Sequence, residues 1–296
     1  MSSKLVKIAL TAFLVLMHAG ASAEDIDLFR GAPAGDSNVL FIIDNAASFS
    51  ANAATCTYPD GTAPSMNGTI GGVEQCALYA TVNNLKASDS LKIGVMAFNF
   101  NGMHDWQGNV CQSGGDGGCL MVPVMPMTEA NKALFLAWIK TWDGTYKIKA
   151  NKAATGAVMQ EAWAYFAGRT GLSGRSYAGM QPTTDCGENY VIYVSGTEKT
   201  PNDSTGDPGP KNALEGTNTD LLKNAFPPAT ATQKAKFLGP VTTMCGTTKF
   251  TDGNHENDGF YADEWVRYMA AEDTTAITTY TIGVYDTIKT CSPITA

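Results

Sequence analysis

Residues 38–50 of the chain, NVLFIIDNAASFS, are the stretch that decides the fold. Positions 39–43 are all apolar and rich in Val and Ile, which is typical of a strand buried on both faces of a parallel sheet. The run ends in Asp44 and continues into small and hydroxyl-bearing residues. In parallel α/β sheets the ligand site lies in the loops beyond the carboxyl ends of the strands, so this loop is a candidate binding site.

The rest of the chain alternates between apolar runs and segments with helical spacing of apolar residues. The predicted elements are strands at 38–44, 91–98, 120–127, 189–195 and 278–285, and helices at 68–85, 128–140, 153–167 and 262–271. Pro123 and Pro126 confine the strand at 120–127 to an edge, or to a partial strand. The alternation implies βαβ units, so we predict an α/β fold with a doubly wound, mainly parallel sheet and disulfide-stapled loop insertions.

The N-terminus has the pattern of an export signal. Lys4 and Lys7 precede an apolar run at 8–17, and the small residues at 21–23 form a cleavage site. The apolar run is shorter than the ~20 residues of a membrane span, and no second long run follows. We predict a signal peptide at 1–23 and one mature domain at 24–296 without a transmembrane segment.

Charge and cysteine content limit the kinds of protein that the mature chain can be. Without the two lysines of the signal peptide it has 18 basic and 28 acidic residues, a formal charge of −10, which argues against nucleic acid as a partner. An exported chain with seven cysteines is expected to form disulfides. The pairs that close local, turn-rich loops are Cys56 with Cys76 and Cys111 with Cys119. Cys186 and Cys291 could meet if their strands are neighbours, which would leave Cys245 single.

The strand, the Asp44-Asn-Ala-Ala-Ser48 loop and the amphipathic helix that follows resemble the start of a von Willebrand factor A-type domain. In that family a D-x-S-x-S motif, a Thr and a second Asp hold a divalent cation. The resemblance assigns ligand positions to Asp44, Ser48, Thr155 and Ser195 and implies Mg²⁺ or Ca²⁺ as cofactor. Ala46 replaces the first Ser, and Ser195 stands where the family has its second Asp. Because the loss of a carboxylate weakens cation binding, we expect this site to be degenerate and to hold no cation.

Several flanking segments extend the resemblance to the N-terminal region of PilY-type proteins, the tip-associated adhesins and biogenesis factors of type IV pili. They are EDIDLF at 24–29, the segment from Cys56 to Tyr79, and DEWVRY at 263–268 before TTYTIGVY at 278–285. Family members continue into a C-terminal β-propeller, so this chain is either a fragment or a short homologue. The resemblance implies minor pilins of the pilus tip as partners, a role in adhesion, twitching motility and pilus biogenesis, and a location from the periplasm to the cell surface.

Other sites and functions are less well supported by the sequence. No catalytic motif is present, so we do not expect an enzyme. An acid-rich loop at 252–264 has Asn257 and Asp263 where a calcium-binding EF-hand loop needs Gly and Glu. Its candidate cation ligands are Asp252, Asn254, Glu256 and Asp258. The alternatives are a secreted hydrolase that uses His255, and a free-standing secreted protein that binds carbohydrate or matrix. The five tryptophans could include a sugar-stacking platform for the second alternative, although those at helical positions are more often part of a core.

Overall fold

The computed structural model describes residues 36–99, 102–111, 117–144, 147–148, 155–182, 187–196, 262–271 and 276–284. The chain divides into the units Met1–Ala34 and Gly35–Ala296, and the described residues all belong to the second. Several predicted features lie outside the described residues: the signal peptide at 1–23, Cys186, Cys245, Cys291, and the candidate cation ligands between Asp252 and Asp258.

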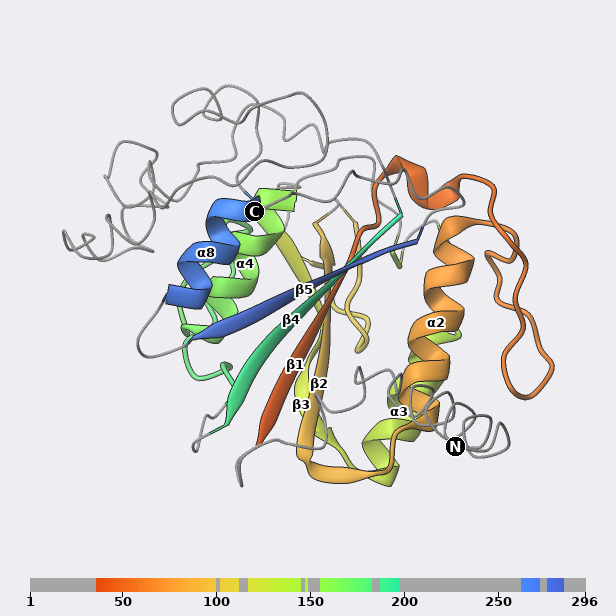
Figure 1. Ribbon diagram of the computed structural model, residues 1–296, viewed down its shortest axis with the longest axis horizontal. Helices are drawn as coiled ribbons and strands as arrows, with labels where there is room; N and C mark the ends of the chain where they lie inside the picture. Colours follow the sequence, from red (N-terminus) through yellow and green to blue (C-terminus); the bar gives the residue numbers. More distant parts are fainter. Residues whose placement is uncertain are drawn as a thin grey trace, which may run out of the picture. The chain divides into compact units, whose positions relative to one another are not determined.

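A five-stranded sheet forms the centre of the described unit (Figure 1). Its strands are β1 (Ser37–Ile43), β2 (Ser88–Phe98), β3 (Gly118–Met127), β4 (Glu188–Ser195) and β5 (Ile277–Gly283), in the order β3-β2-β1-β4-β5. β1 pairs in parallel with β2 and β4, and β4 pairs in parallel with β5. β1 is therefore a central strand, and its apolar residues are buried on both faces, as their composition predicts.

The prediction of a doubly wound, mainly parallel sheet of the von Willebrand factor A type is wrong, because the sheet is mixed. β3 runs antiparallel to β2 along one edge. The described connection between these strands, residues 102–111, contains turns and an isolated bridge and no helix. A parallel return needs a long crossover, usually a helix, so this chain turns back and pairs antiparallel. The described residues do not establish a von Willebrand factor A fold.

Helices cover both faces of the sheet (Figure 1). They are α2 (Ile70–Asn84), α3 (Glu129–Ile139), α4 (Thr155–Phe166) and α8 (Ala262–Ala271), with a short 3-10 helix η2 (Ala47–Ser50) after β1. Thr69 caps α2 by accepting a hydrogen bond from Gly72 N at 3.1 Å, and the predicted cap Thr128 does the same for α3 at 3.2 Å. No helix among the described residues is long and apolar enough to cross a membrane.

Two cores result from the alternation of side chains along β1. Leu40 and Ile42 pack in one core with residues of α4 and α8. Val39, Phe41 and Ile43 pack in the other with residues of α2 and α3. Because successive strand residues face opposite sides, the end of β1 can place one polar side chain on the α4 side.

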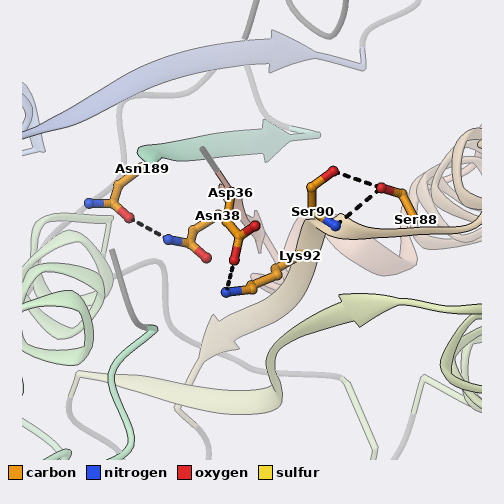
Figure 2. Close-up of polar contacts among 6 residues, drawn as sticks. All are labelled: Asp36, Asn38, Ser88, Ser90, Lys92 and Asn189. Carbon is orange, nitrogen blue, oxygen red and sulfur yellow. Dashed lines mark hydrogen bonds and ion pairs between the residues drawn. The ribbon is translucent and has the colours of Figure 1, made fainter. Parts of the chain in front are cut away.

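The beginnings of the parallel strands are joined by polar contacts (Figure 2). Asn38 Nδ2 donates to Asn189 Oδ1 at 3.0 Å, and these two buried residues are partners in the β1–β4 register. Lys92 Nζ lies 2.6 Å from Asp36 Oδ2. These contacts specify how β1 aligns with its neighbours, and therefore which residues meet at the opposite end of the sheet.

Two disulfides tie loops to the helices and strands. Cys56 is bonded to Cys76 of α2, with Cα atoms 6.5 Å apart, and Cys111 to Cys119 of β3, with Cα atoms 5.7 Å apart. Both are pairings that the sequence predicts. Disulfides form and persist in oxidising compartments, so this is an exported or cell-surface protein.

Candidate functional site

Asp44 lies at the carboxyl end of β1, between the ends of β2 and β4. Its side chain is buried, with the residue only 1 % exposed. Its backbone N–H donates to Val194 O of β4 at 2.9 Å. The carboxylate accepts hydrogen bonds from Ser195 Oγ at 2.8 Å and from Ala46 N at 3.1 Å. The parallel pairing of β1 with β4 thus brings Asp44 and Ser195 together although 151 positions separate them.

Tyr193 links this pair to Thr155, the first residue of α4. The Tyr193 hydroxyl donates to Asp44 Oδ2 at 3.3 Å and lies 3.3 Å from Thr155 Oγ1. The structure therefore brings together three of the four residues predicted for the site. The fourth, Ser48, lies in η2; its hydroxyl oxygen is buried and has no hydrogen-bond partner among the described residues.

The electrostatics of Asp44 are set mainly by burial. Burial raises the pKa of Asp44, and the hydrogen bonds that the carboxylate accepts, foremost the one from Ser195, oppose that rise. Within the described residues no Lys or Arg forms an ion pair with Asp44. The carboxylate is therefore stabilised by protein dipoles rather than by a positively charged side chain.

Asn45 fixes the loop after β1 to the end of β2. Its Oδ1 accepts a hydrogen bond from Phe98 N at 2.7 Å, and its Nδ2 donates to Phe98 O at 3.3 Å. Sequence reasoning missed this residue, since nothing in the sequence indicates that β2 ends beside the loop. The loop after β1 is therefore held between the end of β2, through Asn45, and the end of β4, through Asp44.

Glu74 of α2 is a second buried carboxyl group that sequence reasoning missed. It is 1 % exposed, and neither carboxylate oxygen has a hydrogen-bond partner among the described residues. A Cβ atom built on Gly196, the residue after Ser195, would lie 3.1 Å from Glu74 Oε1. Burial, and then the charge of Asp44, raise the pKa of Glu74 well above its ordinary value. The Glu74 carboxylate therefore lies beside the end of β4.

The sequence did carry a signal for Glu74. The buried residues of α2 are Gly71, Gly72, Glu74, Gln75, Leu78 and Val82. Their spacing marks the helix face toward the core, where an acidic side chain is unusual. A charged residue on a core-facing helix stripe is a sequence signal for a candidate site residue.

The approach of η2 to α2 depends on Gly71. A Cβ atom at this position would lie 2.5 Å from Phe49 Cε1, so only glycine allows the Phe49 ring to pack here. The close packing places η2, the 3-10 helix that carries Ser48, against α2 (Figure 1). Asp44, Ser48 and Glu74 thus come from elements that meet at one end of the sheet.

The side-chain atoms of this site that could coordinate a cation are all oxygens. They comprise the carboxylates of Asp44 and Glu74 and the hydroxyls of Ser48, Thr155, Tyr193 and Ser195. No group of three or more His, Cys, Asp or Glu side chains clusters among the described residues. A cation held here would therefore depend on two carboxylates supplemented by hydroxyl oxygens.

Four of the five tryptophans are not available to the stacking platform of the carbohydrate-binding alternative, and the fifth, Trp106, is half-buried. Trp138, Trp142, Trp163 and Trp265 are buried in the two cores, and Trp163 packs against Trp265 with ring centroids 5.9 Å apart. A sugar stacks on an exposed aromatic face, which these four side chains do not offer.

No protein-family model and no curated protein matches this chain. Solved structures with partial similarity include the proximal thread matrix protein 1 of the mussel byssus, 13 % identical over 56 % of this chain and 29 % of that one, with a TM-score of 0.30. The pilus adhesin SpaC of Lactobacillus rhamnosus GG is 11 % identical over 57 % of this chain and 16 % of its own, with a TM-score of 0.34. The PilB minor pilin of Streptococcus sanguinis, a D319A mutant, is 11 % identical over 85 % of this chain and 51 % of its own, with a TM-score of 0.33. The chain spans about half or less of each of these proteins, and at such TM-scores the similarity does not establish a shared fold.

Proposed function

We propose that this chain is a pilus-associated cell-surface protein that takes part in adhesion and pilus biogenesis by binding a partner at the loops after β1 and β4. The observation that carries this proposal is the buried cluster of Asp44, Tyr193, Thr155 and Ser195 at the carboxyl ends of these strands. Burial of polar groups destabilises a fold unless they are paired, and this cluster lies where α/β sheets bind their ligands.

The disulfides support a surface role. Cys56–Cys76 anchors the loop after η2 to α2, next to the proposed binding face. A covalent tie keeps such a loop closed when the chain is pulled or exposed to proteases outside the cell.

The type IV pilus system is proposed on the sequence resemblance to PilY-type proteins, which includes the segment from Cys56 to Tyr79. The partner in this proposal is a minor pilin of the pilus tip. A binding role without catalysis is part of the proposal, because the cluster offers carboxyl and hydroxyl groups and has no histidine among its described residues.

Deletion of the gene in the organism of origin, followed by complementation, tests this function. We expect deletion to lower the number of surface pili, twitching and attachment, and the wild-type gene to restore all three. Asp44→Asn should restore export of the protein but not attachment, whereas Glu188→Gln, the matched control at the opposite end of β4, should restore both. Unchanged pilus number, twitching and attachment in the deletion strain would refute the proposal.

Shearing of pili from the cells separates this function from that of a free-standing secreted binder. A pilus-associated protein should co-purify with sheared pili, as detected by immunoblotting. Recovery of the protein only from the culture medium would instead favour the free-standing binder.

A further inference from the structure

We infer that this protein forms a symmetric dimer in which β5 of one chain pairs antiparallel with β5 of a second copy, so that the two sheets join into one. The inference goes beyond the proposed function, because it concerns self-association and a different part of the sheet from the loops after β1 and β4. It depends on the free edge of β5, on its lack of charge and on the order of its residues.

The edge of the sheet at β3 is blocked against further pairing. The backbone carbonyl of Met121 accepts a hydrogen bond from Trp106 N at 2.9 Å, and Val124 N donates to the Tyr165 hydroxyl at 2.9 Å. The two prolines of β3 have no N–H to donate, and its register with β2 is irregular. Prolines, irregular pairing and covering loops are means by which proteins prevent an edge strand from pairing with another chain.

The opposite edge, at β5, has none of these features. β5 pairs with β4 on one side, and no strand among the described residues pairs with it on the other. Apart from its pairing with β4, residues 277–283 make no backbone hydrogen bond within the described part of the chain. The strand contains no proline, lysine or acidic residue. Its outer row of backbone N–H and C=O groups is therefore a template for another strand.

One face of β5 also exposes large apolar side chains near this free edge. Tyr280 is 39 % exposed and Ile282 is 49 % exposed. The centroid of the Tyr280 ring lies 6.4 Å from that of Tyr190 on β4. Ile277, on the other face, is buried in the core that contains residues of α8, the helix that packs against β5 (Figure 1). The face that carries Tyr280 is thus the one on which a further strand would bury apolar surface.

Charge favours a second copy of this chain at the β5 edge. The chain is acidic, with a formal charge of −8, so two copies repel each other over most surfaces. Residues 277–283 carry no charged side chain, so a two-fold axis through β5 places no like charges opposite each other. A basic partner segment would find no carboxylate on this strand with which to pair.

The order of residues in β5, ITTYTIG, suits pairing with itself. Antiparallel pairing of all seven residues with their own copy is centred on Tyr280, which then lies opposite Tyr280 of the partner subunit. Thr279 lies opposite the partner subunit's Thr281, and Thr278 opposite the partner subunit's Ile282. Aromatic pairs and Thr–Thr pairs are favourable when they lie directly across from each other on neighbouring strands.

The assembly that results is closed. Pairing through β5 uses the free edge of both copies, and the outer strands of the joined sheet are then the two β3 strands. Because the β3 edge is blocked, no third copy can add by strand pairing. An interface that uses the same surface on both subunits gives a dimer and not a filament.

Sedimentation velocity of the whole exported protein over a wide range of concentrations tests the inference. We expect the mass to rise with concentration to twice that of one chain. Tyr280→Lys should weaken dimerisation at least about tenfold, because it removes the aromatic pair and places two positive charges opposite each other. Leu134→Lys is the matched control, since it makes an apolar-to-lysine change at an exposed residue of α3 and should dimerise as the wild type does.

Cysteine cross-linking tests the register. Opposite residues of antiparallel strands have Cα atoms about 4.5–5.5 Å apart, which a disulfide can span. Tyr280→Cys should therefore form a covalent dimer under oxidation, beyond the background that the wild-type cysteines give. Ile282→Cys should stay at that background, because its two copies lie four positions apart along the paired strands.

Circular dichroism verifies that each variant is folded, and if Tyr280→Lys does not fold, the mass of the wild type and the cross-linking decide the outcome. The inference is wrong if the wild type stays monomeric, if folded Tyr280→Lys dimerises as tightly as the wild type, or if Ile282→Cys cross-links as readily as Tyr280→Cys. For a monomeric wild type, hydrogen exchange identifies the occupant of the edge. Protected β5 amides would show that another segment of this chain covers it, and unprotected amides would leave it to a strand of another protein.

Discussion

Replacement of Asn38 by Leu should destabilise the protein and disturb the alignment that places Asp44 beside Ser195. Asn38 and Asn189 are 0 % and 5 % exposed and are joined by the hydrogen bond shown in Figure 2. They are direct partners in the parallel register of β1 and β4. In this register Ile43 is opposite Val194, so the next residue on each strand is Asp44 and Ser195. A slip by one residue would turn each side chain to the other face of the sheet.

The expected loss of stability follows from the buried polar group that the substitution leaves without a partner. Asn38→Leu removes the donor, so Asn189 Oδ1 remains buried without a partner, which costs about 1–3 kcal/mol. Asn38 Oδ1 already lacks a partner among the described residues, so its removal recovers part of this cost. We expect a net destabilisation of about 1–2 kcal/mol, or a fall in melting temperature of about 2–8 °C for a domain of this size.

A double-mutant cycle measured by urea unfolding tests this reasoning. Asn38→Leu with Asn189→Leu leaves neither polar group buried, so the double variant should be closer to the wild type in stability than the two single costs would predict. Ser90→Ala, an exposed change at the same end of the sheet, should alter stability by less than about 0.5 kcal/mol. Single costs that simply add within about 0.5 kcal/mol would refute the proposed pairing.

Three further predictions concern the site, a disulfide and a buried acid. Ser195→Ala should destabilise the protein by about 1–3 kcal/mol in urea unfolding, because buried Asp44 loses a hydrogen bond to its charged form. The double variant Cys56→Ser/Cys76→Ser should lose about 3 kcal/mol, as expected for a disulfide whose cysteines are 20 residues apart. Burial raises the pKa of Glu161 above its ordinary value of 4.5, so the unfolded state loses its proton first as the pH rises. The stability of the wild type relative to Glu161→Gln should therefore fall as the pH rises from about 4.5 and level off above the folded-state pKa.

Each of these predictions has its own control. Ser50→Ala, an exposed serine after the same strand as Asp44, should leave stability unchanged and shows whether loss of any hydroxyl has an effect. Reduction of the wild type with dithiothreitol should lower its stability at least as much as the cysteine substitutions do. Ser50→Ala also serves as the pH control, because it has the same ionisable groups as the wild type and should give a stability difference that varies little with pH. A difference for Glu161→Gln that grows in favour of the wild type at high pH would contradict the sign derived from burial.

The positions of the strands and helices could be predicted from the sequence because each carries a local signal. The run at 39–43 has the composition of a buried strand, and Thr128 marks the start of α3. Pro123 and Pro126 indicate an edge strand, and β3 is at the edge of the sheet. These signals depend only on neighbouring residues.

The direction of β3 and half of the site could not be predicted in the same way. Strand direction depends on whether the connection forms a crossover, and the residues between β2 and β3 give no clear signal of either outcome. Asn45 acts through the end of β2, 53 positions away, and Glu74 acts through the approach of α2 to Gly196. Long-range contacts of this kind are set by packing, which a local pattern does not contain.

The two hydrogen bonds between Asn45 and Phe98 have a consequence for the speed of recognition. They hold the loop after β1 in one shape before any partner arrives. In the proposed binding function, a partner would meet a surface that needs no rearrangement, and little conformational entropy would be lost on association. The association rate should then depend on the frequency of correctly oriented collisions, and differences in affinity among partners should appear chiefly as differences in how long each one stays bound.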